Sequence, residues 1–184
     1  MRTQAKLLDK YMNTAAKGTV QWIGVRPERK AKMNILDSVE AIENRGLVGD
    51  RSCENSNGSA RQITLINAED IEALARFLNY EKIDPAVLRR NIVVSGLNLK
   101  SMRYQTLQLG TAVIEIGAHC HPCSRMEQAL GKGALLAMYG YGGYCAKVLK
   151  GGVINLGDEL LRLDRNNEDH SAKGHDDQQL SLTI

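Results

Sequence analysis

Two cysteines, Cys120 and Cys123, are separated by two residues, and histidines flank the first of them at His119 and His121. Four sulfur or imidazole ligands therefore fall within five residues, directly after an apolar, strand-like stretch. A cysteine thiolate is a strong nucleophile and a good ligand for soft metals, whereas the protonated thiol is neither. This segment carries the densest reactive chemistry in the chain, so any function must account for it first.

The residue types of this segment are compatible with three kinds of site. Cys120, Cys123 and one or both histidines match a zinc site, although structural zinc sites usually pair two such ligand groups. A Cys-x-x-Cys pair is also typical of thioredoxin-like redox sites, which normally belong to a βαβ frame that this sequence does not predict. The third kind is a single activated thiolate at Cys123, with Arg125 and His121 beside it. Small thiols buried in the core are the ordinary alternative.

Arg89, Arg90 and Asn91 form a polar run that precedes a predicted strand. A guanidinium group donates two parallel hydrogen bonds to phosphate or carboxylate oxygens, so these residues are candidates for binding an anionic group. Arg61 on a predicted loop and Arg125 beside the cysteines extend this candidate set. The ordinary alternative to an anion-binding site is that these arginines are isolated charges in contact with solvent.

The composition predicts a single globular domain. The chain has 184 residues, of which 43% are hydrophobic, and this is large enough to bury a core without disulfides. No apolar run reaches about 18 residues, the length of a membrane-spanning helix, and no signal-peptide pattern opens the chain. We therefore expect a cytoplasmic protein that binds no membrane, with its four cysteines as reduced thiols.

The net charge of +3 is unevenly distributed. Residues 1–32 hold eight Lys or Arg and two acidic residues, whereas residues 164–184 hold two basic and five acidic residues. The basic residues at the start are scattered and no aromatic side chains interleave them, so a solvated helix face is favoured over nucleic-acid binding. We expect no nucleic-acid partner.

Short β-branched stretches between glycine turns predict a mainly β fold. We expect about eight strands, near residues 19–25, 38–42, 61–66, 91–94, 106–109, 112–116, 146–149 and 158–163. The most regular helical spacing of apolar residues covers residues 68–78. Strands and helices do not alternate regularly. The prediction is therefore a closed or curled, mixed or antiparallel β-barrel with two or three short helices.

The barrel is expected to occupy residues 18–163, between an N-terminal extension at 1–17 and a flexible polar tail at 164–184. Residues 1–16 have the pattern of a short amphipathic helix. Residues 52–60 are rich in serine, asparagine and glycine and predict a loop.

Five segments occur in an order that resembles the MOSC domain family, named after the C-terminal domain of molybdenum cofactor sulfurases. They are residues 46–51 (GLVGDR), 61–66 (RQITLI), 88–96 (LRRNIVVSG), 120–126 (CHPCSRM) and 151–158 (GGVINLGD). The ordered set is specific, and the resemblance spans roughly residues 18–163. One departure is Ser52, where many relatives carry histidine.

The resemblance implies a strand-rich barrel whose rim carries one key cysteine, which falls on Cys123. Relatives bind molybdenum cofactor (molybdopterin) and use this thiolate as a molybdenum ligand or as a sulfur carrier. Some relatives are oxidoreductases that reduce N-hydroxylated bases with electrons from partner proteins. By the same resemblance, Arg89, Arg90 and Arg61 would hold the pterin phosphate. An electron-donor or sulfur-donor protein and a small-molecule substrate are the partners that this implies.

A rival function uses the same segment without molybdenum. Cys123, with Cys120 and His121 as secondary metal ligands, could hold zinc in a non-catalytic module. Alternatively, the segment could carry a persulfide. The sequence leaves these alternatives open.

Overall fold

The structure is a computed structural model that describes residues 17–55 and 58–163. The helix predicted within residues 1–16 and the flexible tail predicted for 164–184 lie outside the described residues. The strands are β1 (Gly18–Val25), β2 (Asn34–Leu36), β3 (Ser38–Ile42), β4 (Gly46–Leu47), β5 (Ile63–Asn67), β6 (Ile92–Ser95), β7 (Thr106–Leu109), β8 (Ala112–His119), β9 (Tyr144–Lys150), β10 (Gly152–Asn155) and β11 (Glu159–Arg162). The helices are α2 (Arg51–Asn55), α3 (Ala68–Phe77), α4 (Pro85–Leu88), α5 (Ser124–Leu130) and α6 (Ala134–Ala137).

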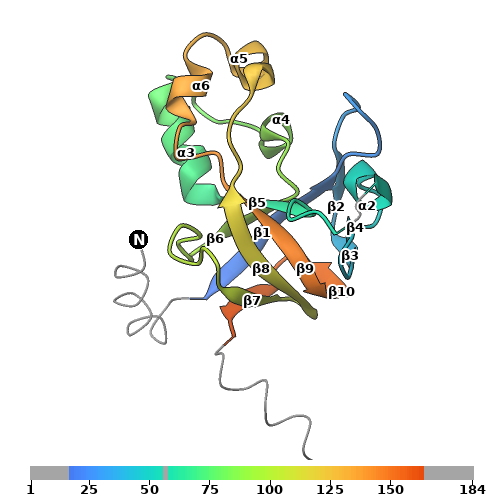
Figure 1. The fold of residues 1–184 in the computed structure, drawn as a ribbon. Coiled ribbons are helices and arrows are strands. Elements are labelled where there is room, and N and C mark those ends of the chain that lie inside the picture. The colour runs from blue at the N-terminus through green and yellow to red at the C-terminus, as the bar shows by residue number, and fades with distance from the viewer. Residues whose placement is uncertain (1–16, 56–57, 164–184) are drawn as a thin grey trace, which may run out of the picture.

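Seven strands close into a mixed β-barrel (Figure 1). Their hydrogen-bonded order is β11-β7-β8-β9-β5-β6-β1, and β1 pairs back with β11. β5 and β6 run parallel, whereas the other neighbouring pairs of the ring are antiparallel. β2 extends the sheet from β1, and β10, β3 and β4 form a separate three-stranded sheet. The prediction of a mainly β fold with a closed or curled, mixed or antiparallel barrel is therefore confirmed, and the barrel is closed and mixed.

The interior of the barrel is filled by alternate residues of its strands. In β8, Ala112, Ile114 and Ile116 are fully buried, whereas Glu115 between them is exposed. This period of two places one face of the strand in the core and the other outside. Because the inward face is aliphatic, side chains that carry chemistry come from the strand ends and the connections between them.

A second apolar cluster, separate from the barrel interior, holds the helices α3 to α6 at one end of the barrel (Figure 1). Ile66 of β5 and Val93 of β6 belong to it, together with Leu74 of α3 and Met126 of α5. Because Met126 is buried in this cluster, α5 is fixed to the barrel. The connection that precedes α5, with Cys123, is thereby held at the rim.

The described residues contain five short helices, more than the two or three predicted. The sequence predicts a loop over residues 52–60, but α2 forms there because the Asp50 carboxylate accepts a hydrogen bond from the Ser52 backbone N–H (2.9 Å), as an N-cap does. The short α6 depends on the Glu127 carboxylate of α5, which accepts hydrogen bonds from two backbone N–H groups at 2.7 and 2.8 Å. Within the described residues, no helix has the length and apolar character needed to cross a membrane.

The first turn of α3 supplies a prediction about stability. Burial raises the pKa of Asp70, and the neighbouring Glu69 carboxylate raises it further, to about 6. A carboxyl pKa that is raised in the folded state means that ionisation of Asp70 opposes folding. The stabilising contribution of Asp70 to the free energy of unfolding is therefore complete below about pH 4 and is lost as the pH rises through 6. We expect Asp70→Asn to raise the melting temperature at pH 8 and to leave it unchanged at pH 4. An equal shift at both pH values, or the same shift in the exposed control Glu72→Gln, would contradict this.

Candidate functional site

Cys123 lies in the connection between β8 and α5, at the N-cap position of the helix. Its backbone is extended (φ −125°, ψ 170°), and its side chain makes no capping hydrogen bond. The residue is exposed. Its thiol is therefore accessible to an external ligand, which a reactive role for Cys123 requires.

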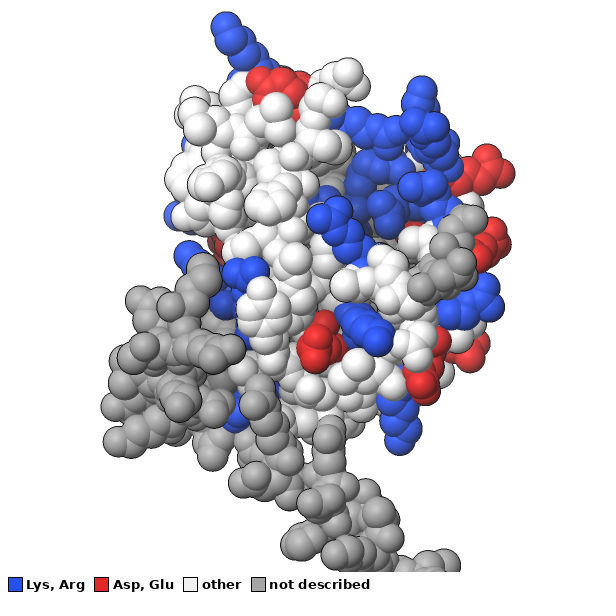
Figure 2. All heavy atoms as spheres, viewed as in Figure 1, with Lys and Arg blue, Asp and Glu red and all other residues white. Residues whose placement is uncertain are grey.

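Four arginines from separate parts of the chain form what we call the arginine cluster: Arg26 after β1, Arg51 in α2, Arg89 after α4 and Arg125 in α5. Burial lowers the pKa of Arg89, and the positive charges of Arg26 and Arg125 lower it further. Because like charges repel, an anion bound among these side chains would lower the electrostatic energy of the cluster. Figure 2 shows basic side chains gathered at the upper right, over the region where Figure 1 places α2, α4 and the β1–β2 loop.

Arg89 is held in place by its backbone and by one hydrogen bond. It has φ 57° at the C-terminal end of α4, a left-handed conformation that is uncommon for a residue other than glycine. Its Nη1 donates to the carbonyl oxygen of Ala31 at 2.9 Å. This bond ties α4 to the β1–β2 loop across the site.

Asp50, which is 1% exposed, is the carboxylate beneath the arginine cluster. Arg26 donates to it from Nε (3.2 Å) and Nη2 (3.3 Å). Asn91 Nδ2 donates at 2.8 Å and Ser52 Oγ at 2.6 Å. Burial alone would raise the pKa of Asp50, but the hydrogen bonds from Ser52 and the charge of Arg26 outweigh burial and lower it to about 2. The carboxylate therefore stays ionised in the folded protein at neutral pH.

Two of the predicted cofactor-binding residues, Arg90 and Asn91, are buried in the scaffold of the site. Arg90 is 7% exposed and donates to the carbonyl oxygens of Gly142 (2.6 Å), Leu88 (3.1 Å) and Cys120 (3.2 Å). Asn91 is 1% exposed and its amide hydrogen-bonds within the protein. Both side chains join strand ends, so they position the site from beneath.

The structure brings Cys120 beside a second thiol. Its side chain hydrogen-bonds with that of Cys145 in β9, which is 2% exposed. Arg61, an exposed member of the predicted set, lies close enough to add its positive charge to this pair, as do Arg90 and Arg26. Arg26 thus belongs to the surroundings of both the arginine cluster and the thiol pair.

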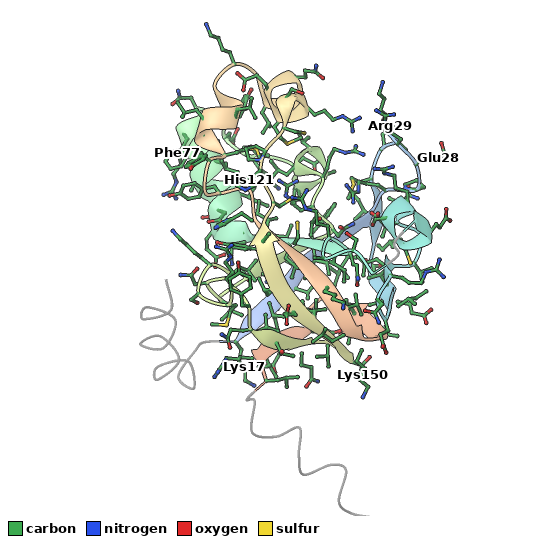
Figure 3. All side chains as sticks on the ribbon, viewed as in Figure 1. Lys17, Glu28, Arg29, Phe77, His121 and Lys150 are labelled. Atoms are coloured by element: carbon green, nitrogen blue, oxygen red, sulfur yellow. The ribbon has the colours of Figure 1, made fainter. Side chains whose placement is uncertain are left out.

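The two histidines of the segment have different neighbours. The ring of His119 packs against Tyr144 with centroids 4.5 Å apart and lies 6.2 Å from the ring of His121. Both histidines line a cavity of about 160 Å³ together with Lys100. Figure 3 shows His121 on the side of α3 and α6, whereas Arg29 lies on the β1–β2 loop.

A zinc site would need the ligands of this segment to converge. Within residues 17–55 and 58–163, no three His, Cys, Asp or Glu side chains are grouped so that they could hold a metal ion. Cys120 contacts Cys145, His119 contacts Tyr144, and Cys123 is exposed. The zinc alternative therefore has no preformed ligand set in the part of the chain that the structure describes.

Sequence reasoning gave no role to three residues of this site: Arg26, Asp50 and Cys145. The Gly-Asp-Arg step at residues 49–51 belongs to a segment that resembles the MOSC family, but the resemblance gives Asp50 no role. An acidic residue inside a glycine turn that precedes a basic residue could have suggested a buried carboxylate. Nothing local in the sequence places Arg26 or Cys145, because β1 and β9 reach the site only through closure of the barrel.

A family model for the MOSC domain matches residues 53–161, more than half of the 184 residues. The chain belongs to the MOSC domain family. The matched part of this MOSC domain includes Arg89, Cys123 and Arg125, whereas Arg26 and Asp50 precede it.

Several solved structures resemble this MOSC domain. The YuaD protein from Bacillus subtilis has a TM-score of 0.66 at 19% identity, covering 78% of this chain and 94% of that one. YiiM from Geobacillus stearothermophilus has a TM-score of 0.65 at 16% identity, covering 82% and 77%. YiiM from Escherichia coli has a TM-score of 0.62 at 18% identity, covering 80% and 70%. At these identities the likeness shows a shared fold. A search of curated proteins found no match.

Proposed function

We propose that this MOSC protein binds molybdenum cofactor, with the Cys123 thiolate as a molybdenum ligand and the arginine cluster as the binding site for the pterin phosphate. The observation that carries the proposal is the exposed thiol of Cys123, two residues before Arg125, whose positive charge reaches Arg89 in the arginine cluster. With the cofactor bound, the protein would be the molybdenum component of an oxidoreductase that acts on N-hydroxylated small molecules. Its electrons would come from a partner protein in the cytoplasm.

The residues present fit such a cofactor chemically. A thiolate is a soft ligand and suits a molybdenum ion that other sulfur atoms already hold. The fork of an arginine side chain suits phosphate oxygens. The lowered pKa of Arg89, caused by burial and then by its arginine neighbours, indicates that a bound anion would relieve repulsion.

Each residue of the site would have a separate task. Cys123 would supply the ligand sulfur, and Arg89, Arg125 and Arg61 would bind the anionic part of the cofactor. Arg90 and Asn91 would act from beneath by holding the strand ends in place through the hydrogen bonds described above. When bound, the cofactor supplies two-electron redox chemistry, and the exposed position of Cys123 leaves room for a substrate.

A sulfur-carrier role would use the same exposed thiol, with a sulfur-donor protein as partner. The exposure of Cys123, which transfer of sulfur to and from another protein requires, supports this as the second candidate. It predicts a persulfide on Cys123, visible as one added sulfur atom by mass spectrometry of the protein before reduction. A cofactor-loaded protein in which Cys123 never carries extra sulfur would favour the reductase.

The experiment that tests cofactor binding is molybdenum and pterin analysis of protein produced in a host that makes the cofactor. We expect molybdenum and pterin together in the wild type. In Arg125→Gln we expect about a tenfold loss of both, because a hydrogen bond to a charged group contributes about 1.5–3 kcal/mol. Arg76→Gln is the matched control, since Arg76 is an exposed arginine at the end of α3. Equal contents in both variants, or no pterin in the wild type, would contradict the proposal.

A further inference from the structure

Cys120 and Cys145 are brought together by the pairing of β8 with β9. His119 is paired with Tyr144, and their rings pack together on one face. Because successive residues of paired strands point to opposite faces, the next residue on each side, Cys120 and Cys145, points to the other face. There each thiol lies close enough to the other to be the largest influence on its pKa. The pair thus joins residues 25 positions apart, and Cys123 is not its partner.

The backbones that carry the two thiols are held against each other. The N–H of Cys120 donates to the carbonyl oxygen of Gly143 at 2.9 Å. Arg90 donates to the carbonyl oxygens of both Cys120 (3.2 Å) and Gly142 (2.6 Å). A side chain at Gly142 would collide with the carbonyl oxygen of Cys120, so glycine is required for this approach. The contact between the two segments is therefore built into the fold.

The two thiols differ in access to solvent. Cys145 is 2% exposed, whereas Cys120 is half-buried and lies just beyond the end of β8. A small oxidant in solution can therefore reach Cys120 first. Once Cys120 has reacted, Cys145 is the neighbouring thiol that its sulfur already contacts. In this arrangement, one thiol reacts with the oxidant and a second thiol then converts the product into a disulfide.

The charges around the pair favour the same division of roles. The hydrogen bond from Cys145 lowers the pKa of Cys120, burial opposes this, and Arg90 and Arg61 lower it further, to about 6. The hydrogen bond with Cys120 and burial both raise the pKa of Cys145. These directions agree with the roles that solvent access already gives to the two thiols. A thiolate attacks the electrophilic oxygen of a hydroperoxide much faster than a thiol does.

We propose that Cys120 and Cys145 form a reversible disulfide, in which a hydroperoxide oxidises Cys120 and Cys145 resolves the product. In the first step, the Cys120 sulfur attacks the terminal oxygen of the hydroperoxide. A sulfur–oxygen bond forms, the oxygen–oxygen bond breaks, and the alcohol leaves with a proton from solvent. In the second step, the Cys145 sulfur attacks the Cys120 sulfenic acid, the disulfide forms, and water leaves with the Cys145 proton. Two thiols and one hydroperoxide thus give one disulfide, one alcohol and one water.

The proposal is independent of molybdenum, since neither step involves Cys123 or a bound cofactor. A disulfide requires the two Cα atoms to lie within about 7 Å. The connection from Cys120 to Cys123 belongs to no helix or strand, so it is the part that can adjust. The Cys120 end of the disulfide would lie three residues before Cys123. When formed, the disulfide would hold the connection between Cys120 and Cys123 against β9.

The test is peroxide treatment of the full-length protein at neutral pH, followed by alkylation and tryptic digestion without reduction. Cleavage after Arg103 and Arg125 leaves Cys120 and Cys123 in one peptide, whereas cleavage after Lys132 puts Cys145 in another. We expect a disulfide between the two peptides, reversed by dithiothreitol. A link within the first peptide, between its own two cysteines, would overturn the proposal, as would full alkylation of all cysteines after treatment.

Two variants make the result specific. Cys123→Ser must still form the link between the two peptides. Cys145→Ala must instead leave Cys120 as a sulfenic acid, trapped by dimedone.

Cys53 is the internal reference, because burial raises its pKa and it is 5% exposed. We expect Cys120 to react at least about tenfold faster than Cys53, and equal rates would contradict its proposed role. Because the wild-type digest alone identifies the link, misfolding of a variant does not remove the test.

Discussion

Replacing Cys123 with serine is expected to lower the molybdenum content of the purified protein by about tenfold or more. Serine keeps the size and polarity of the side chain but removes the soft sulfur that molybdenum prefers. Cys123 is exposed and makes no capping hydrogen bond, so the change should leave the fold intact. Elemental analysis per mole of protein, after production in a host that makes the cofactor, measures the effect.

Cys120→Ser is the matched control, because it removes a thiol from the same connection. It should retain most of the molybdenum, since Cys120 contacts Cys145 and is not part of the proposed ligand set. Equal losses in both variants would indicate damage to the connection as a whole. A fully loaded Cys123→Ser protein would overturn the assignment of the ligand, whereas Cys123→Ser with pterin but no metal would support it directly.

Asp50→Ala is expected to destabilise the protein by about 3–5 kcal/mol. The carboxylate is 1% exposed and accepts hydrogen bonds from Arg26, Asn91 and Ser52. Its removal leaves a partly buried guanidinium and a buried amide without their partner. Because a domain of this kind is stable by only about 5–15 kcal/mol, this is a large fraction of the total. Urea unfolding at pH 7 measures the effect. A loss below about 1 kcal/mol would contradict the central role of Asp50.

The Asp50 carboxylate also makes the free energy of unfolding depend on pH in a defined direction. The pKa of Asp50 is lowered from 3.8 to about 2 in the folded state by the groups that contact it. A lowered folded-state pKa contributes stability above the unfolded value, and that contribution, about 2 kcal/mol, is lost as the pH falls from about 4 to 2. Asp50→Asn should lack this part of the acid dependence. If the wild type and Asp50→Asn lose stability in parallel over this range, the shift in pKa is not the cause.

Much of the fold could be predicted because short strands have a local signature. The β-branched runs at residues 63–67 and 92–95 and the hairpin over 106–119 lie where the sequence placed strands. The one-turn helices α2 and α6 were missed for the opposite reason. They are held by single carboxylates, Asp50 and Glu127, and one turn is too short to show a periodic pattern.

For the site, the sequence alone predicted the family, the barrel and the segment that carries reactive thiols, since each depends on local patterns and on their order along the chain. Only the tertiary structure decided what surrounds those thiols. Closure of the barrel brings Arg26 and Asp50 beside Arg89 and Arg125, and the pairing of β8 with β9 puts Cys120 and Cys145 on the same face. Burial and charge act between groups that lie a few ångströms apart in space, whatever their separation along the chain. A sequence pattern records only the separation along the chain.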